Sequence, residues 1–218
     1  MNKRVFQNIL QFSVLFVMVH LLTTAALAQQ KQVDSLQELV QTSAEDTTKV
    51  NRLLKLAHFL APQDPAQALA YSGQARALAD ELGFNYGTIT AYVRMGEAFL
   101  AQNSYSEAHT VSDLAARFAQ NAENNRLLAR SYLLKGKIFR KQQLYDLSGR
   151  ELDRALQLSQ NLDNSILAAR IQREQGITHR ENEKYREAVA ELNSALDRYE
   201  SAGRTIDIAH THYELGVT

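Results

Sequence analysis

Apolar residues recur at helical spacing through most of the chain. Residues 86–102 and 105–120 each carry them three or four positions apart, which is the period of one face of a helix. The polar residues Asn103 and Ser104 separate the two stretches, so the pattern predicts two helices joined by a short turn. The predicted apolar stripes are Tyr92, Met95, Gly96 and Phe99 in the first helix and Ala108, Val111, Ala115 and Phe118 in the second.

This predicted hairpin repeats with a period of about 40 residues, which lies in the range of about 20–50 that is typical of a stacked array. Small residues would lie where two helices approach closely, because a larger side chain would push their axes apart, and we expect the large aromatic residues to fill the space beside them. The repeating positions are Gly96, Gly136, Gly176 and Gly216, then Ala75, Ala115, Ala155 and Ala195, and then Tyr105, Tyr145 and Tyr185.

These positions resemble the pattern of the tetratricopeptide repeat. That family has a small residue and then an aromatic residue in its first helix, Tyr or Phe at the start of the second, and Ala at two later positions. One unit here has Gly96, Phe99, Tyr105, Ala108 and Ala115 in those places. The resemblance implies an all-α, right-handed solenoid of helix hairpins. The family's basic unit has about 34 residues, and we expect the additional residues of the longer period in the loops between units.

The chain divides by pattern into a leader and an array. A basic start at Lys3 and Arg4, an apolar run and the small residues Ala26-Leu27-Ala28 are typical of a secretory signal peptide cleaved after Ala28, the alternative being an uncleaved membrane anchor. Cleavage would place the protein in the periplasm or at another extracytoplasmic face, with no membrane span in the mature segment. The predicted segments are a signal peptide at 1–28, a helical lead-in at 29–45 and repeats over 46–218, as units 46–85, 86–125, 126–165, 166–205 and a partial 206–218.

Composition excludes several functions. The 24 Lys and Arg balance 24 Asp and Glu, so net charge gives no reason to expect nucleic-acid binding. The absence of Cys excludes disulfides, thiolate metal sites and a lipid-modified N-terminal Cys. Glycine-rich phosphate loops and the His-Glu-x-x-His motif are absent. His210 and His212 lie two residues apart and would face different directions on a helix. We therefore expect no catalytic residue, cofactor or metal site in this chain.

Basic residues gather on the exposed face of two predicted first helices. We expect these side chains to line a groove for a protein or peptide with carboxylate groups, held by charge-assisted hydrogen bonds. The alternative is an ordinary solvated face that acids such as Glu174 and Glu181 balance. The candidate groove residues are Arg130, Lys137, Arg140, Lys141, Arg170, Arg173 and Arg180.

The start of the predicted mature chain has a second resemblance. The run from Asp34 to Val40, the stretch Asp46-Thr47-Thr48-Lys49 and the helix opening at Asp64-Pro65 look like the exported repeat region of bacterial sensor histidine kinases. That resemblance implies a sensing or scaffolding role in signal transduction, and the final predicted helix at 205–218 without a second helix suggests a truncated parent. Two alternatives remain open: a free-standing periplasmic scaffold for envelope complexes, and the repeat region of a membrane-linked transcription regulator.

Overall fold

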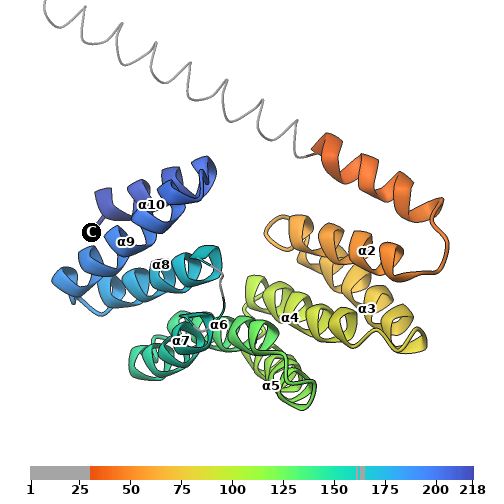
Figure 1. Ribbon diagram of the computed structural model, residues 1–218, viewed down its shortest axis with the longest axis horizontal. Coiled ribbons are helices and arrows are strands. Elements are labelled where there is room, and N and C mark those ends of the chain that lie inside the picture. The colour runs from red at the N-terminus through yellow and green to blue at the C-terminus, as the bar shows by residue number, and fades with distance from the viewer. Residues whose placement is uncertain (1–29, 161, 163–164) are drawn as a thin grey trace, which may run out of the picture. The chain divides into compact units, whose positions relative to one another are not determined.

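The protein is described by a computed structural model that covers residues 30–160, 162 and 165–218. The described residues form helices and turns, without a strand (Figure 1). The predicted signal peptide at 1–28 lies outside them. The helices are α2 (Thr47–Leu60), α3 (Pro65–Glu81), α4 (Asn85–Ala101), α5 (Tyr105–Asn121), α6 (Asn125–Lys141), α7 (Tyr145–Gln160), α8 (Ser165–Glu181), α9 (Tyr185–Ser201) and α10 (Thr205–Gly216).

The chain separates into two units, residues 1–44 and 45–218. In the first unit, residues 30–41 are helical. In the second unit each helix packs against the next one along the chain, and α2, α4, α6 and α8 also contact one another in succession. In Figure 1 the helices of this unit follow a curve, with α4 and α6 on its inner side and α5 and α7 outside them. The expected solenoid of helix hairpins is therefore confirmed. We call the even-numbered helices the A helices and the odd-numbered ones the B helices.

Three of the repeating glycines lie where an A helix meets a leucine side chain. A Cβ atom added at Gly136 would lie 2.6 Å from Cγ of Leu152, and one at Gly176 would lie 2.6 Å from Cγ of Leu192. At Gly96 the nearest atom is Cδ2 of Leu134, at 2.5 Å. No side chain larger than hydrogen fits these positions without displacing its neighbour. The alanines of the B helices, Ala75, Ala115, Ala155 and Ala195, are completely buried.

The tyrosines at the start of the B helices are less uniform than expected. Tyr105 packs against a buried cluster that includes Ile138 of the following A helix. Tyr185 is instead 53% exposed. Ile138 belongs to α6, whereas the A helix that follows Tyr185 is α10, which ends at Gly216. The expectation that these aromatic residues fill the interior is therefore wrong for Tyr185.

The expectation that the additional residues of the long period lie in the loops between units was also wrong. The helices α4, α5, α6, α8 and α9 have 17 residues each. Three residues separate α4 from α5, and three also separate α5 from α6. The additional residues therefore lie in the helices, and the turns inside and between these hairpins are equally short. Backbone φ is positive at one residue in each of six such turns, at Gly83, Asn103, Glu123, Gln143, Glu183 and Gly203.

We predict opposite effects for alanine at two glycines. Gly176→Ala should lower the free energy of unfolding by about 1–3 kcal/mol, because the methyl group overlaps Leu192 and lies 3.1 Å from the carbonyl oxygen of Ala188. Gly149→Ala should raise it by about 0.5–1 kcal/mol, because Gly149 is inside α7 and an added Cβ would meet no atom within 4 Å. Urea unfolding followed by far-ultraviolet circular dichroism measures both values. Equal effects at the two positions would contradict the packing described here.

Candidate functional site

A cavity of about 440 Å³ runs along the A helices of the second unit. We call it the groove. Its lining comes from α2, α4, α6, α8 and α10, so residues from well-separated parts of the sequence meet there. Within α4, α6 and α8 the lining positions are one, three or four residues apart, which places them on one face. The polar and charged lining residues are His58, Arg94, Glu97, Arg130, Lys137, Arg170, Arg173, Glu174, Asp207 and His210.

The groove contains four of the seven residues that the sequence indicated. Arg130, Lys137, Arg170 and Arg173 line it. The other three, Arg140, Lys141 and Arg180, do not appear in its lining. Arg140 is bound to acids, with Nη1 2.6 Å from Oε1 of Glu181 and Nη2 3.3 Å from Oε2 of Glu174. Arg180 forms an ion pair with Glu214, and Lys141 is exposed at the end of α6.

Glu174 is a buried acid that joins two A helices. Its Oε1 lies 3.3 Å from Nζ of Lys137, and Arg140 of α6 binds its other oxygen. Burial alone would raise the pKa of Glu174, but Lys137 and Arg140 reverse that effect and hold it below its ordinary value. The interpretation of the basic residues as a face balanced by acids therefore applies to Lys137 and Arg140.

A second charged cluster at the groove was missed by the sequence reasoning. Nη1 of Arg94 lies 2.6 Å from Oε2 of Glu97 and 3.0 Å from Nδ1 of His58 on α2. Burial would raise the pKa of Glu97, but the charge of Arg94 and the nearby His58 outweigh it, and that pKa lies well below its usual range. The three-residue spacing of Arg94 and Glu97 could have suggested their pair. Nothing in the sequence places His58 beside them.

Two arginines of the groove have no acidic partner. Arg130 on α6 is half-buried and Arg170 on α8 is exposed, and neither forms an ion pair or hydrogen bond within the part of the chain that the structure describes. Burial lowers the pKa of Arg130, and the neighbouring guanidinium groups of Arg94 and Arg170 lower it further, while Glu97 offsets only part of this. An arginine stays protonated in proteins, so this site holds uncompensated positive charge.

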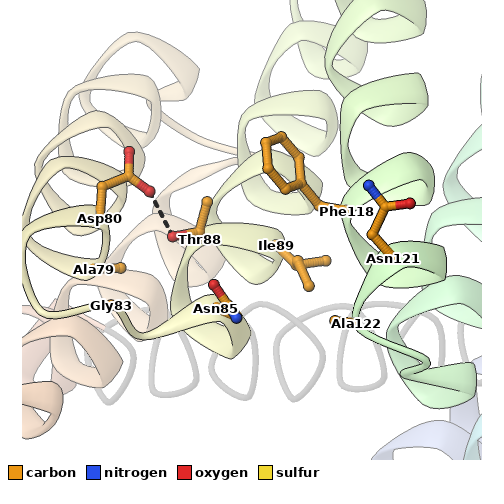
Figure 2. A pocket seen from close by; sticks show the side chains of 9 residues that line it. All are labelled: Ala79, Asp80, Gly83, Asn85, Thr88, Ile89, Phe118, Asn121 and Ala122. Atoms are coloured by element: carbon orange, nitrogen blue, oxygen red, sulfur yellow. Dashed lines mark hydrogen bonds between the residues drawn. The ribbon is translucent and has the colours of Figure 1, made fainter.

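A smaller cavity of about 240 Å³ lies between α3, α4 and α5 (Figure 2). Figure 2 shows Asp80 accepting a hydrogen bond from the Thr88 hydroxyl, at 2.6 Å, and Phe118 at the opposite side of the cavity. Phe118 is 44% exposed and stacks on Tyr92, with ring centroids 5.7 Å apart. The only charged side chain of this lining, Asp80, is already bound to Thr88 and Arg76, so the groove offers the stronger recognition chemistry.

Among residues 30–160, 162 and 165–218, no group of three or more His, Cys, Asp or Glu could hold a metal ion. His210 lines the groove, whereas His212 does not. No helix in the same ranges has the length and apolar character needed to cross a membrane.

Comparisons with known proteins agree with this geometry. Residues 127–201 match the family model of the tetratricopeptide repeat. The chain is similar in structure to BtubC (BKLC) from P. vanneervenii, with a TM-score of 0.63 and 16% identity over 87% of this chain and 80% of that one. It is also similar to the apo form of RapI, with a TM-score of 0.61 and 12% identity over 84% of this chain, and it spans about half, 52%, of RapI. No curated protein matches the sequence.

We predict that acid weakens the fold through Glu174. Because the pKa of this carboxyl is lowered in the folded protein, its contribution to stability is present above the unfolded value of 4.5 and is lost as pH falls below it. Glu174→Gln should lower the free energy of unfolding at pH 7 by about 2 kcal/mol and should flatten its decline below about pH 4.5. Urea unfolding at a series of pH values measures both effects. The control is Glu200→Gln, at an exposed acid of α9; an equal change in the control would contradict the role of Glu174.

Proposed function

We propose that this tetratricopeptide repeat protein binds an acidic segment of another protein in the groove along its A helices. Tetratricopeptide repeats generally mediate binding between proteins and typically have no catalytic role, so a binding function agrees with the family match. The acidic character of the partner is the further step, and it rests on the charges of the groove.

The observation that carries the proposal is the pair Arg130 and Arg170. Most charged residues of the groove are already neutralised by a neighbour, as Glu174 is by Lys137. Leaving a half-buried guanidinium without a partner is unfavourable, because burial removes part of its hydration. A carboxylate from a ligand would supply the missing charge and could accept two parallel hydrogen bonds from each guanidinium. The groove is therefore better suited to an acidic ligand than to a neutral or basic one.

We also propose that the protein works outside the cytoplasm, as the sensing or scaffolding part of a signalling protein. The layout of residues 1–28, with Lys3 and Arg4 before an apolar run, supports export. The resemblance of the Asp34–Val40 and Asp64-Pro65 regions to sensor histidine kinases supports the signalling role and a kinase parent. The coding sequence downstream of Thr218 tests this parent. A membrane-spanning helix followed by a kinase domain would support it, and further repeats with a polar end would favour a free-standing scaffold instead.

We predict that the two unpaired arginines are needed for acidic ligands. The probe is a fluorescein-labelled hexaglutamate peptide, with hexaglutamine as the neutral comparison, and fluorescence anisotropy gives the dissociation constant. The double variant Arg130→Ala/Arg170→Ala should weaken hexaglutamate binding at least tenfold, because each charge-assisted hydrogen bond contributes about 1.5–3 kcal/mol.

The matched control is Arg117→Ala/Arg186→Ala, which removes the same charge from the exposed sides of the B helices α5 and α9. It should change the affinity less than twofold. Equal losses in the two double variants would mean that binding follows net charge alone. Equal binding of hexaglutamate and hexaglutamine by the unaltered protein would overturn the proposal.

We predict that export removes residues 1–28. When the whole chain with a C-terminal tag is produced in a Gram-negative bacterium, the periplasmic fraction should contain protein that begins at Gln29, as measured by intact mass. Ala26→Leu/Ala28→Leu should leave the segment attached, because signal peptidases need small residues before the cleaved bond. A full-length product in the cytoplasm would contradict the proposed location.

A further inference from the structure

One position of the B helices has lost its side chain in a single repeat. The position recurs every 40 residues, once in each of α3, α5, α7 and α9, as Leu69, His109, Gly149 and Val189. A Cβ atom added at Gly149 would meet no atom within 4 Å. There is therefore open space beside α7 at a place where the other three B helices have a side chain.

The imidazole ring of His109 shows what this place can hold. Its centroid lies 4.7 Å from that of Phe139 on α6, with the two rings tilted by 51°. Its Nε2 lies 2.9 Å from Oε1 of Gln142, the residue that follows α6. An amide oxygen only accepts hydrogen bonds, so the ring nitrogen is the donor. Between α5 and α6, a planar ring is thus held by an aromatic side chain and an amide.

The same two holding groups are present between α7 and α8, but without a ring to hold. His179 is equivalent to Phe139, and Asn182 is equivalent to Gln142. Both side chains are half-buried, and neither forms a hydrogen bond, ion pair or ring contact with any other residue that the structure describes. Gly149 offers them no group. An aromatic ring and an amide are therefore both available at this place.

A cavity of about 220 Å³ lies there, between α7 and the end of α8. We call it the ring pocket. Gly149, His179 and Asn182 all line it. A cavity of about 150 Å³ is large enough to bind benzene. The ring pocket is therefore large enough for a planar five-membered ring.

The charges of the ring pocket favour a neutral ligand. Asp153 accepts a hydrogen bond from Nε2 of Gln175, at 2.8 Å. Because the formal charges of the lining balance, neither an anion nor a cation is preferred, and selection depends on shape and hydrogen bonding. The ring pocket differs in this respect from the groove, where positive charge is uncompensated. Its charged lining residues are two acids and two bases, Asp146, Asp153, Arg150 and Lys184.

From this open space and its two free neighbours we propose that the ring pocket binds a neutral planar ring of imidazole size with an N–H donor. The ring packs against His179 and donates a hydrogen bond to Oδ1 of Asn182. Its source is a free heterocycle or a histidine side chain of another protein, because both present the same ring. The ring pocket is separate from the groove, so this proposal does not rest on the function proposed for the groove.

The test is a titration of the protein with imidazole at pH 8, where an imidazole ring is mostly neutral. Nuclear magnetic resonance follows the His179 ring and the Asn182 side-chain amide. Both signals should shift and saturate with a dissociation constant below about 10 mM, which is reasonable for a ligand of so few atoms. Thiophene has a similar planar ring without an N–H group and should bind at least fivefold more weakly, about the effect of one lost hydrogen bond.

A variant that fills the ring pocket tests its location. Gly149→His should abolish imidazole binding, because the new side chain occupies the place that His109 occupies between α5 and α6. The matched control is Gly73→His inside α3, where an added Cβ also meets no atom within 4 Å. The control should change the affinity less than twofold. Circular dichroism and unfolding midpoints establish that each variant is folded.

Replacing the two holding groups tests their roles. His179→Ala and Asn182→Ala should each weaken imidazole binding at least fivefold, about the effect of one lost contact. His179→Phe should bind within twofold of the unaltered protein, because Phe139 holds the His109 ring in the same way. A loss in His179→Phe as large as that in His179→Ala would contradict the packing role of this ring.

A histidine peptide, acetyl-Gly-His-Gly-amide, separates the two sources of the ring. Binding at least as tight as that of imidazole would identify a histidine side chain of another protein. Weaker binding than that of imidazole would identify a free heterocycle. The proposal is overturned if neither probe gives saturable shifts at His179 and Asn182, if thiophene binds as tightly as imidazole, or if Gly149→His binds as tightly as Gly73→His.

Discussion

The repeat array depends on the close approach of helix backbone to leucine side chains at its repeating glycines. Leu152 occupies the space that a side chain at Gly136 would need, and Leu192 does the same at Gly176. These two contacts fix how α6 lies against α7 and how α8 lies against α9. The same contact in these two successive repeats presents α6 and α8 in the same orientation. The groove, with Arg130 and Arg170 at equivalent positions, follows from that repetition.

Ion pairs then act between A helices whose arrangement is already determined by packing. Glu174 and Arg140 join α6 to α8, and Arg180 and Glu214 join α8 to α10. A buried ion pair contributes little net stability unless its groups are fully paired, but the loss of one partner is strongly unfavourable. Such pairs therefore fix neighbouring A helices in one relative position more than they strengthen the fold. They also remove most of the basic charge that the sequence shows, and leave a small part of it available.

The sequence allowed the fold to be predicted closely, because the repeat supplies several independent indications of one arrangement. The predicted helix at 86–102 agrees with α4 within a residue, and that at 105–120 agrees with α5. The turns were harder to predict from the sequence. Positive φ occurs there at Asn103, Glu123, Gln143 and Glu183, without the glycine that usually marks such a conformation. The expectation that the long period reflects long loops failed because the additional residues lie in helices of 17 residues. The candidate site was predicted only in part. Helical spacing placed Arg130 and Arg170 correctly on the groove face, but it could not distinguish them from Arg140 and Arg180. That distinction depends on acids contributed by the next A helix, 34 and 41 residues away from Arg140.

The short and nearly equal turns have a consequence for how such a chain can change over generations. A duplication or deletion of a whole repeat such as α6–α7 or α8–α9 keeps the contact between glycine and leucine in the remaining repeats and adds or removes one position of the groove. A change of half a repeat would also preserve helix and turn lengths, yet it would exchange the roles of the two helices and break those contacts. Recombination between units is therefore constrained to whole periods, and within that constraint the reach of the binding surface can lengthen or shorten by one step at a time.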